Sequence, residues 1–211
     1  MFVNRFLPFI NTAAQSCYNS VTMPSPMTHD RNLRDLMRER LPARIFNRLE
    51  DAGRLARQSG AAAFVVGGLV RDLLLGRATI DVDIAVEGDG MAFARRLADR
   101  QGAALKIFER FATAYVVFPD RMKFDIASTR AGQPARLGAG NEGAWSAPAG
   151  ESCSIEQDLM RRDFTINALA IHLNAGRFGQ LLDPSEGLRD LRGRTIRAVG
   201  DRSFTDDPTR V

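Results

Sequence analysis

The sequence predicts an α+β fold, and three observations carry that prediction. An apolar run at residues 61–66 leads into a Gly67-Gly68 turn and then into a helical pattern, as a short buried strand followed by a helix would. Residues 81–86 alternate strictly between two faces, which is typical of a strand with one buried side. Further patterns follow closely: a helix at 90–101 and strands at 104–108, 113–118 and 122–128.

The composition indicates a folded protein with a basic surface. The 211 residues are 45% hydrophobic and 26% charged, which favours a packed core over disorder. The net charge of +4 and the pI of about 9.7 are compatible with a polyanionic partner such as nucleic acid or a nucleotide, and equally with a merely basic protein. No apolar run approaches the ~18 residues that span a membrane, so we expect no membrane partner and a cytoplasmic location.

Asp81 and Asp83 are the most informative pair of side chains in the chain. They share one face of the alternating strand, while Val82 and its apolar neighbours take the other face. Two carboxylates this close repel each other, and a divalent cation is the usual way to relieve the repulsion. Because Mg²⁺ is typically held by one or two carboxylates together with substrate phosphates, we predict a Mg²⁺ site here.

Ligands of other kinds are scarce: the two cysteines alone cannot supply a four-ligand zinc site, and the two histidines are too few for a histidine metal cluster. Oxygen ligands are therefore the better hypothesis. On the strand predicted at 122–128, Asp125 shares a face with Lys123. Asp125 is either a third carboxylate beside Asp81 and Asp83 or an ordinary exposed aspartate paired with a neighbouring arginine, and the sequence leaves both readings open.

The Gly67-Gly68 turn is a candidate phosphate site. A strand, two glycines and a helix start bring backbone N–H groups close to a ligand, which suits a phosphate. A Gly-Gly turn alone is more often just a tight turn. With Arg71 one turn into the helix and the acidic pair shortly after it, we interpret the segment as part of a nucleotide site.

The second half of the chain is predicted to alternate between loop, helix and strand. Residues 131–153 are rich in Gly, Ala, Ser and Pro and form a long loop that is either functional or disordered. Ser154 and Gln157 match a capping box, and the helix that starts there is expected to run into residues 161–168. The later elements are a strand at 169–173, a short helix at 188–191 and a last strand at 195–199.

Three segments, in this order, carry a specific resemblance to a known family. They are Gly-Gly-Leu-Val-Arg-Asp-Leu-Leu-Leu-Gly at 67–76 with Asp81-Val82-Asp83, Arg-Arg-Asp-Phe-Thr-Ile-Asn-Ala at 161–168, and residues 183–201 continuing into 204–210. The first two resemble two motifs of the class II tRNA nucleotidyltransferase and bacterial poly(A) polymerase family. The third is similar to the segment that leads into that family's nucleotide-selecting motif. Each motif alone is weak, but their order and spacing make a chance match improbable.

The resemblance implies a polymerase-β-like nucleotidyltransferase fold, with a mixed sheet backed by helices. It implies template-independent addition of CMP or AMP, from CTP or ATP, to an RNA 3′ end by a two-metal mechanism with Mg²⁺ as the cofactor. The reaction is either CCA or A addition to tRNA, the expected RNA, or poly(A) synthesis. Asp125, as a third carboxylate, would complete the catalytic set. The residues that carry over are Asp81 and Asp83 for the metal, Gly67, Gly68 and Arg71 for the triphosphate, Arg162 and Asp163 for the sugar and phosphates, and Asp207 and Arg210 for the base.

Two other functions stay open at this point. The chain could be a non-catalytic head domain that binds a nucleotide or RNA. It could also be a nucleotidyltransferase that modifies a small molecule, although the Arg161-Arg162-Asp163 segment argues against that reading.

The chain departs from the family pattern in three places. Ala112 stands where many relatives have glycine, and Asp206 replaces a glutamate at the start of the base-selecting motif. The loop at 131–153 replaces a segment that is acidic and aromatic in many relatives.

The predicted organisation has four parts. Residues 1–30 form a disordered N-terminal extension, and residues 31–60 form N-terminal helices. Residues 61–200 are the nucleotidyltransferase head domain, and residues 201–211 are the start of a truncated neck region, so the chain looks like a head domain or a fragment.

Overall fold

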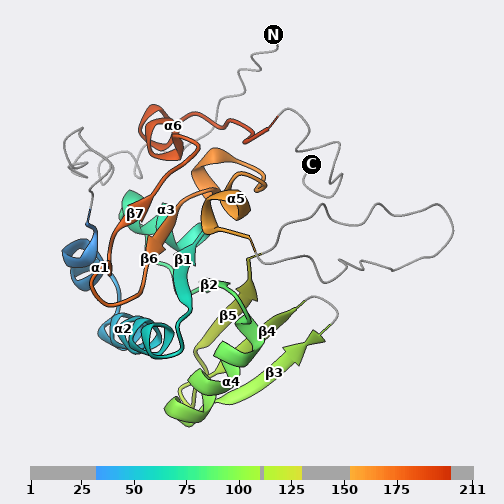
Figure 1. Cartoon of the computed structure of the whole chain (residues 1–211). Helices are drawn as coiled ribbons and strands as arrows, with labels where there is room; N and C mark the ends of the chain where they lie inside the picture. The colour runs from blue at the N-terminus through green and yellow to red at the C-terminus, as the bar shows by residue number, and fades with distance from the viewer. Residues whose placement is uncertain (1–31, 110–111, 130–152, 201–211) are drawn as a thin grey trace, which may run out of the picture.

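The structure, a computed structural model, describes residues 32–109, 112–129 and 153–200 (Figure 1). Its elements, in chain order, are α1 (Arg34–Arg40), α2 (Ala43–Gln58), β1 (Ala62–Val66), α3 (Gly68–Leu75), β2 (Val82–Glu87), α4 (Gly90–Gln101), β3 (Ala104–Phe108), β4 (Thr113–Val117), β5 (Lys123–Ser128), α5 (Ile155–Leu159), the 3₁₀ turn η2 (Thr165–Asn167), β6 (Ala170–His172), β7 (Leu181–Leu182) and α6 (Gly187–Gly193). The predictions for 1–30, for 201–211 and for nearly all of the loop at 131–153 fall outside the described residues. Over the described ranges, none of the helices combines the length and the apolar character that a bilayer crossing requires.

Seven strands form one mixed sheet in the order β3-β4-β5-β2-β1-β6-β7. Neighbouring strands run antiparallel except β2 and β5, which run parallel. A parallel pair cannot be joined by a tight turn, and here α4 and the β3–β4 hairpin fill the connection between its two strands. The prediction of an α+β fold with a mixed sheet backed by helices is confirmed.

One face of the sheet, which we call the back face, packs against α1, α2, α3 and α4 in a single large apolar core. From β2, Val82, Ile84 and Val86 point into this core and are at most 2% exposed. The alternation of residues 81–86 therefore anchors the strand as predicted. The bounds of α4 match the predicted helix at 90–101. At its start the side chain of Asp89 accepts a hydrogen bond from the Ala92 N–H, and at its end Gly102 adopts a left-handed conformation.

The opposite face of the sheet, which we call the front face, is covered over only part of its area. A small apolar cluster joins α5 to β1, β2 and β6: Phe64, Val66, Ala85, Ile155, Leu159, Ala168 and Ala170. Ser154 and Gln157 form the predicted capping box at the start of α5. The prediction that this helix runs into residues 161–168 is wrong, since it ends at Leu159 and the chain turns back over the sheet.

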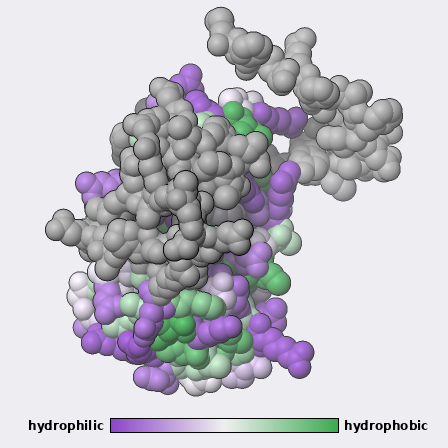
Figure 2. Space-filling model, turned by 90° about the vertical axis from the view of Figure 1, so that its right-hand side faces the viewer, coloured by the Kyte–Doolittle hydropathy of each residue, from purple (hydrophilic) through white to green (hydrophobic). Residues whose placement is uncertain are grey.

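At the far edge of the sheet, β3 closes the β3–β4–β5 half. Leu105 and Ile107 of β3 pack against the back-face core, while Lys106 and Phe108 alternate onto the front face. Seen from this side, hydrophobic residues form a patch among hydrophilic ones in the lower half of the molecule (Figure 2). Among the described residues, the apolar cluster on the front face includes none from β4 or β5, and we call this part of the front face open.

The segment after α6 differs from its prediction. Instead of a strand over 195–199, one isolated bridge joins Ala198 to Phe164. The Thr165 N–H donates to the Arg197 carbonyl and the Val199 N–H donates to the Asp163 carbonyl. Because the partner segment is a turn and not a strand, the pairing cannot extend into a ladder. The two-residue strand β7 was not predicted, since it is too short for any periodicity to show.

Candidate active site

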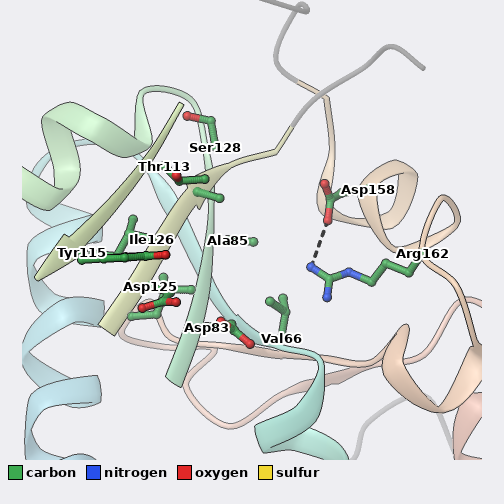
Figure 3. Close-up of a pocket in the computed structure, with 12 residues that line it drawn as sticks. Val66, Asp83, Ala85, Thr113, Tyr115, Asp125, Ile126, Ser128, Asp158 and Arg162 are labelled. Carbon is green, nitrogen blue, oxygen red and sulfur yellow. Dashed lines mark hydrogen bonds and ion pairs between the residues drawn. The ribbon is translucent and has the colours of Figure 1, made fainter. Parts of the chain in front are cut away.

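The open part of the front face forms a cavity of about 290 Å³ between the strands and α5 (Figure 3). The floor comes from β2, β4 and β5, and the far wall comes from α5 and the turn after it. The lining residues are Val66, Asp83, Ile84, Ala85, Thr113, Tyr115, Asp125, Ile126, Ala127, Ser128, Asp158 and Arg162. Two of the predicted carboxylates and one of the predicted arginines therefore meet in one cavity.

Asp83 and Asp125 lie directly side by side on the cavity floor. They are paired residues on the parallel strands β2 and β5, whose backbones are about 4.8 Å apart. Their side chains point to the same face, as Figure 3 shows. Partial removal from water, together with the nearby Asp125 charge, raises the pKa of Asp83 above its ordinary value. Of the two sequence-based readings of Asp125, the structure places it beside Asp83, and its cationic neighbour is a lysine and not an arginine.

Asp81 lies at the edge of this site. It is exposed, it precedes the first residue of β2, and it is not among the residues that line the cavity. Its negative charge nevertheless adds to the raised pKa of Asp83, so the two carboxylates are near each other. Within the described parts of the chain, no three His, Cys, Asp or Glu side chains are grouped closely enough to hold one metal ion. The role predicted for Asp81 remains a prediction.

Arg162 reaches into the cavity from the side opposite the carboxylates. Its guanidinium extends from the turn after α5 toward Val66 and Asp83, and its positive charge favours the ionised form of Asp83 (Figure 3). Its Nη2 donates to Oδ2 of Asp158 at 3.3 Å, four residues earlier. Its Nε is buried and has no hydrogen-bond partner among the described residues. A buried donor without a partner is costly, so this arginine is suited to an anionic ligand.

Gly67 brings the first motif against the second. It has φ +70° and ψ −129°, a conformation that L side chains rarely adopt. A Cβ at this position would also lie 3.1 Å from Nη1 of Arg162. The Gly67 N–H donates to the Leu169 carbonyl at 3.2 Å, which fixes the turn against the chain after the second motif. Glycine is therefore favoured by the turn, and a side chain at this position would also shift the Arg162 guanidinium by a few tenths of an ångström.

Arg71 and Asp163 lie beside the cavity, and neither is among its lining residues. Arg71 makes a two-pronged ion pair with Asp72, and its Nη1 donates to Oδ1 of Asn167 at 2.8 Å. Asn167 in turn donates to Oδ1 of Asp163 at 3.3 Å. Gly68 is adjacent, since a Cβ there would lie 3.7 Å from Nη2 of Arg71. Asn167 thus joins the two motifs, as a structural hydrogen-bonding residue would.

Several lining residues were not identified from the sequence. Tyr115 and Thr113 alternate onto the front face of β4, and Tyr115 is paired with Asp125 across the hairpin. Pairing the two predicted strands around their turn would have revealed this contact. Asp158 carried a weaker signal, namely its helical spacing from Arg162. Asp207 and Arg210, predicted to read the base, lie outside the described residues.

The carboxylate oxygens on the cavity floor are suitable ligands for a divalent cation such as Mg²⁺. Carboxylate oxygens are the hard ligands that such ions prefer. Oδ1 of Asp125 is buried and lacks a hydrogen bond of good geometry among the described residues, although the Lys123 ammonium is 2.8 Å away. These two neighbouring carboxylates, one of which has an oxygen with incomplete hydrogen bonding, are suited to bind an added cation.

Comparison with known proteins identifies similar chains. An A-adding tRNA nucleotidyltransferase of Geobacter sulfurreducens is 45% identical over 176 residues, which make up 83% of this chain and 19% of that protein. A second A-adding enzyme, from Halalkalibacterium halodurans, is 42% identical over 87% of this chain and 41% of its own length. A CC-adding tRNA nucleotidyltransferase of Deinococcus radiodurans is 35% identical over 70% of this chain and 37% of its own length.

Solved structures show the same architecture. The Thermotoga maritima CCA-adding enzyme in complex with tRNA matches with a TM-score of 0.74 at 36% identity, over 87% of this chain and 40% of that one. A CCA-adding enzyme in complex with ATP matches with a TM-score of 0.72 at 38% identity, over 87% of this chain and 39% of that one. The chain thus spans less than half the length of each of these relatives.

The family model of the poly(A) polymerase head domain matches residues 63–197. Apart from Ala62 at the start of β1, that segment contains the seven strands of the sheet and every residue that lines the cavity. The chain therefore belongs to the class II tRNA nucleotidyltransferase and poly(A) polymerase family, with the polymerase-β-like nucleotidyltransferase fold.

Proposed function

We propose that this chain carries the catalytic site for template-independent addition of a nucleotide to the 3′ end of tRNA. One observation supports this above all: Asp83 and Asp125 stand side by side on parallel strands and face the guanidinium of Arg162 across one cavity. Acidic groups suited to a metal ion and a cation suited to phosphates are the two requirements of phosphoryl transfer. The relatives named above as tRNA nucleotidyltransferases support tRNA as the acceptor.

In the proposed reaction, the RNA 3′-hydroxyl attacks the α-phosphate of a nucleoside triphosphate and pyrophosphate leaves. Asp83 and Asp125 would hold Mg²⁺, with Asp81 at the edge of the site as a further ligand. Bound Mg²⁺ would stabilise the charge on both the attacking and the leaving oxygens of an in-line displacement. Arg71 and the Gly68 N–H would orient the triphosphate, and Arg162 and Asp163 would contact the sugar and phosphates.

ATP is the nucleotide that the comparisons favour. The two A-adding relatives are 45% and 42% identical to the chain, and the CC-adding relative is 35% identical. Asp207 and Arg210 would present the edge that reads the base. A cytoplasmic location belongs to the same proposal.

The experiment that tests this function measures incorporation of labelled nucleotide. The 211-residue chain is incubated with Mg²⁺, with either α-labelled ATP or α-labelled CTP, and with tRNA transcripts that end either before or after the two terminal cytidines. We expect AMP to be added once to the transcript that ends in CC. Asp83→Asn is expected to abolish incorporation. Asp99→Asn is the matched control, because it removes an exposed carboxylate on α4, behind the sheet.

Two outcomes would reject the proposal. Binding of ATP to the chain without any incorporation would favour a non-catalytic nucleotide-binding role. Release of pyrophosphate that does not depend on RNA would favour transfer to a small molecule.

A further inference from the structure

Lysine is rare in this chain, and its placement is not random. Only two of the 29 lysine and arginine residues are lysines, Lys106 and Lys123. Both stand on the front face of the β3–β4–β5 hairpins: Lys106 is paired with Tyr115, and Lys123 is two residues before Asp125 on the same strand. Everywhere else the chain uses arginine, so the lysine next to the acidic pair calls for a local explanation.

Lys123 is engaged with Asp125 through both carboxylate oxygens. Its Nζ is 2.8 Å from Oδ1 and donates to Oδ2 at 2.9 Å. The same ammonium lies 4.3 Å from the centre of the Tyr115 ring, which lines the cavity. The lysine therefore occupies the oxygens that a metal ion would need from Asp125.

The register of the parallel strands brings the other carboxylates toward the same ammonium. Val82 is paired with Phe124, so Asp81 and Lys123 each come one residue before a paired position and face the same side. The hydrogen bond to Asp125, and then the charges of Asp125 and Asp81, raise the pKa of Lys123. The Lys123 charge also acts on Asp83. A single positive charge thus stands among all three of the predicted catalytic carboxylates.

Lysine suits this position better than arginine. Its ammonium is a compact point charge on a flexible stem, whereas the planar arginine fork would hold a carboxylate in a fixed two-pronged geometry. The Lys123 side chain is 44% exposed, so it can swing into solvent without disturbing the core. An ammonium that stabilises a carboxylate and can leave it is suited to exchange with another cation.

We propose that Lys123 is a positioning residue that holds the Asp125 carboxylate in place and competes with the divalent cation for it. This inference rests on the proposed function, since it takes Asp125 as a metal ligand. Lys123 keeps the like-charged pair Asp83 and Asp125 compatible until the ion arrives, and it sets the cation concentration at which the site fills.

The test measures Mn²⁺ binding to the full chain without nucleotide, from the electron paramagnetic resonance signal of free Mn²⁺. We expect Lys123→Met to lower the Kd for Mn²⁺ about tenfold, because it removes a competing positive charge a few ångströms from the ion. We expect Lys123→Arg to leave the Kd unchanged or to raise it, because arginine binds the carboxylate at least as firmly. Lys106→Met is the matched control: it removes the same charge from the same face, away from Asp125, and we expect a change of less than about twofold. Thermal unfolding of each variant verifies that it is folded.

The outcomes separate this inference from the proposed function. Asp83→Asn should abolish Mn²⁺ binding in every background. If it does so and Lys123→Met leaves the Kd unchanged or raises it, the role of Lys123 is wrong while the metal site stands. A Lys123→Met variant that weakens ATP binding with no change in the Kd for Mn²⁺ also overturns the inference, in favour of a phosphate contact. If neither the wild-type chain nor Lys123→Met binds Mn²⁺, even with ATP present, the metal site fails and this inference fails with it.

Discussion

The back and front faces of the sheet are built from alternate residues of the same strands, yet they differ in almost every property. On β5, Phe124 and Ile126 point to the back and are at most 1% exposed, whereas Lys123 and Asp125 point to the front and carry charge. The back face binds four helices through apolar contacts, and the front face leaves its charges facing a cavity. The difference shows how a repulsive acidic pair is tolerated: the free energy that keeps β2 and β5 in place comes from the other side of the same strands.

The sharpest test of this division changes adjacent residues on β5. Phe124→Ala should lower the free energy of unfolding by about 3–5 kcal/mol, because Phe124 is fully buried and packs edge-on against Phe118. Asp125→Asn should change it by less than about 1 kcal/mol, since the lost ion pair is partly exposed. The same Asp125→Asn change should reduce nucleotide incorporation by at least about 100-fold. Urea unfolding and the incorporation assay measure the two effects. Equal losses of stability in Phe124→Ala and Asp125→Asn would contradict the view that the back face supplies the stability and the front face the chemistry.

His172 extends the comparison to the covered part of the front face. It is 3% exposed, lies against the Phe64 ring, and accepts a hydrogen bond at Nδ1 from the Asn174 N–H. Burial, with Arg177 nearby, lowers the pKa of His172 to about 4. Between pH 6.5 and pH 4, the unfolded chain, whose histidine pKa is about 6.5, binds a proton at His172 that the folded chain does not bind. The free energy of unfolding should therefore fall by up to about 3 kcal/mol as the pH is lowered through this range.

Denaturant unfolding at several pH values checks this dependence, and His172→Gln is the control. The variant starts from a lower stability at pH 7.5 because it loses the packed ring. Between pH 6.5 and pH 4, its free energy of unfolding should change less steeply with pH than that of the wild type. Parallel curves for the two proteins would show that another group titrates.

Two glycines with positive φ, Gly67 at the site and Gly60 away from it, allow the effect of a substitution in the two turns to be compared. Gly67→Ala should lower the free energy of unfolding by about 2 kcal/mol through backbone strain, and raise the KM for ATP about tenfold by displacing Arg162. Gly60 has a similar φ of +68° with open space around it. Gly60→Ala should therefore cost only about 1 kcal/mol and leave the KM unchanged. Steady-state kinetics and thermal unfolding test both, and a KM that rises in both variants would mean that general loosening of the fold is the cause.

The smallest expected effect concerns Ala112, which precedes β4. Its φ of +42° lies in the left-handed region, which favours glycine. Ala112→Gly should raise the free energy of unfolding by about 0.5–1 kcal/mol, because the strain on the alanine outweighs the added freedom of glycine in the unfolded chain. Ala104→Gly in β3, where φ is not positive, should have the opposite sign. Calorimetric unfolding of the two variants decides whether Ala112 is strained.

The two faces also differ in how well the sequence predicts them. The back face is encoded locally: the alternation of residues 81–86 and the apolar stripe of residues 90–101 are visible in a short window, and both were predicted with nearly the right bounds. The front face depends on register between strands far apart in the chain. The sequence indicates that Asp125 is a candidate for a third carboxylate, but only the β2–β5 pairing places it beside Asp83.

Other features of the site carried little local signal. Lys123 and Asp125 were predicted to share a face of one strand, but their contact depends on rotamers, and the contact of Gly67 with Arg162 depends on the approach of separate motifs. The segment at 195–199 had the composition of a strand, yet its partner is a turn. Strand propensity describes only the segment itself, so it gave the wrong answer there.

The single parallel pairing in the sheet has a consequence for folding. Docking β5 beside β2 closes a loop that contains α4 and the β3–β4 hairpin, so this pairing is a long-range contact that carries a loop-closure cost. No shorter part of the chain can bring Asp83 and Asp125 together. The ability to bind a divalent cation should therefore appear in a refolding chain only once this long-range pairing has formed, which makes cation binding a direct report of the β2–β5 contact.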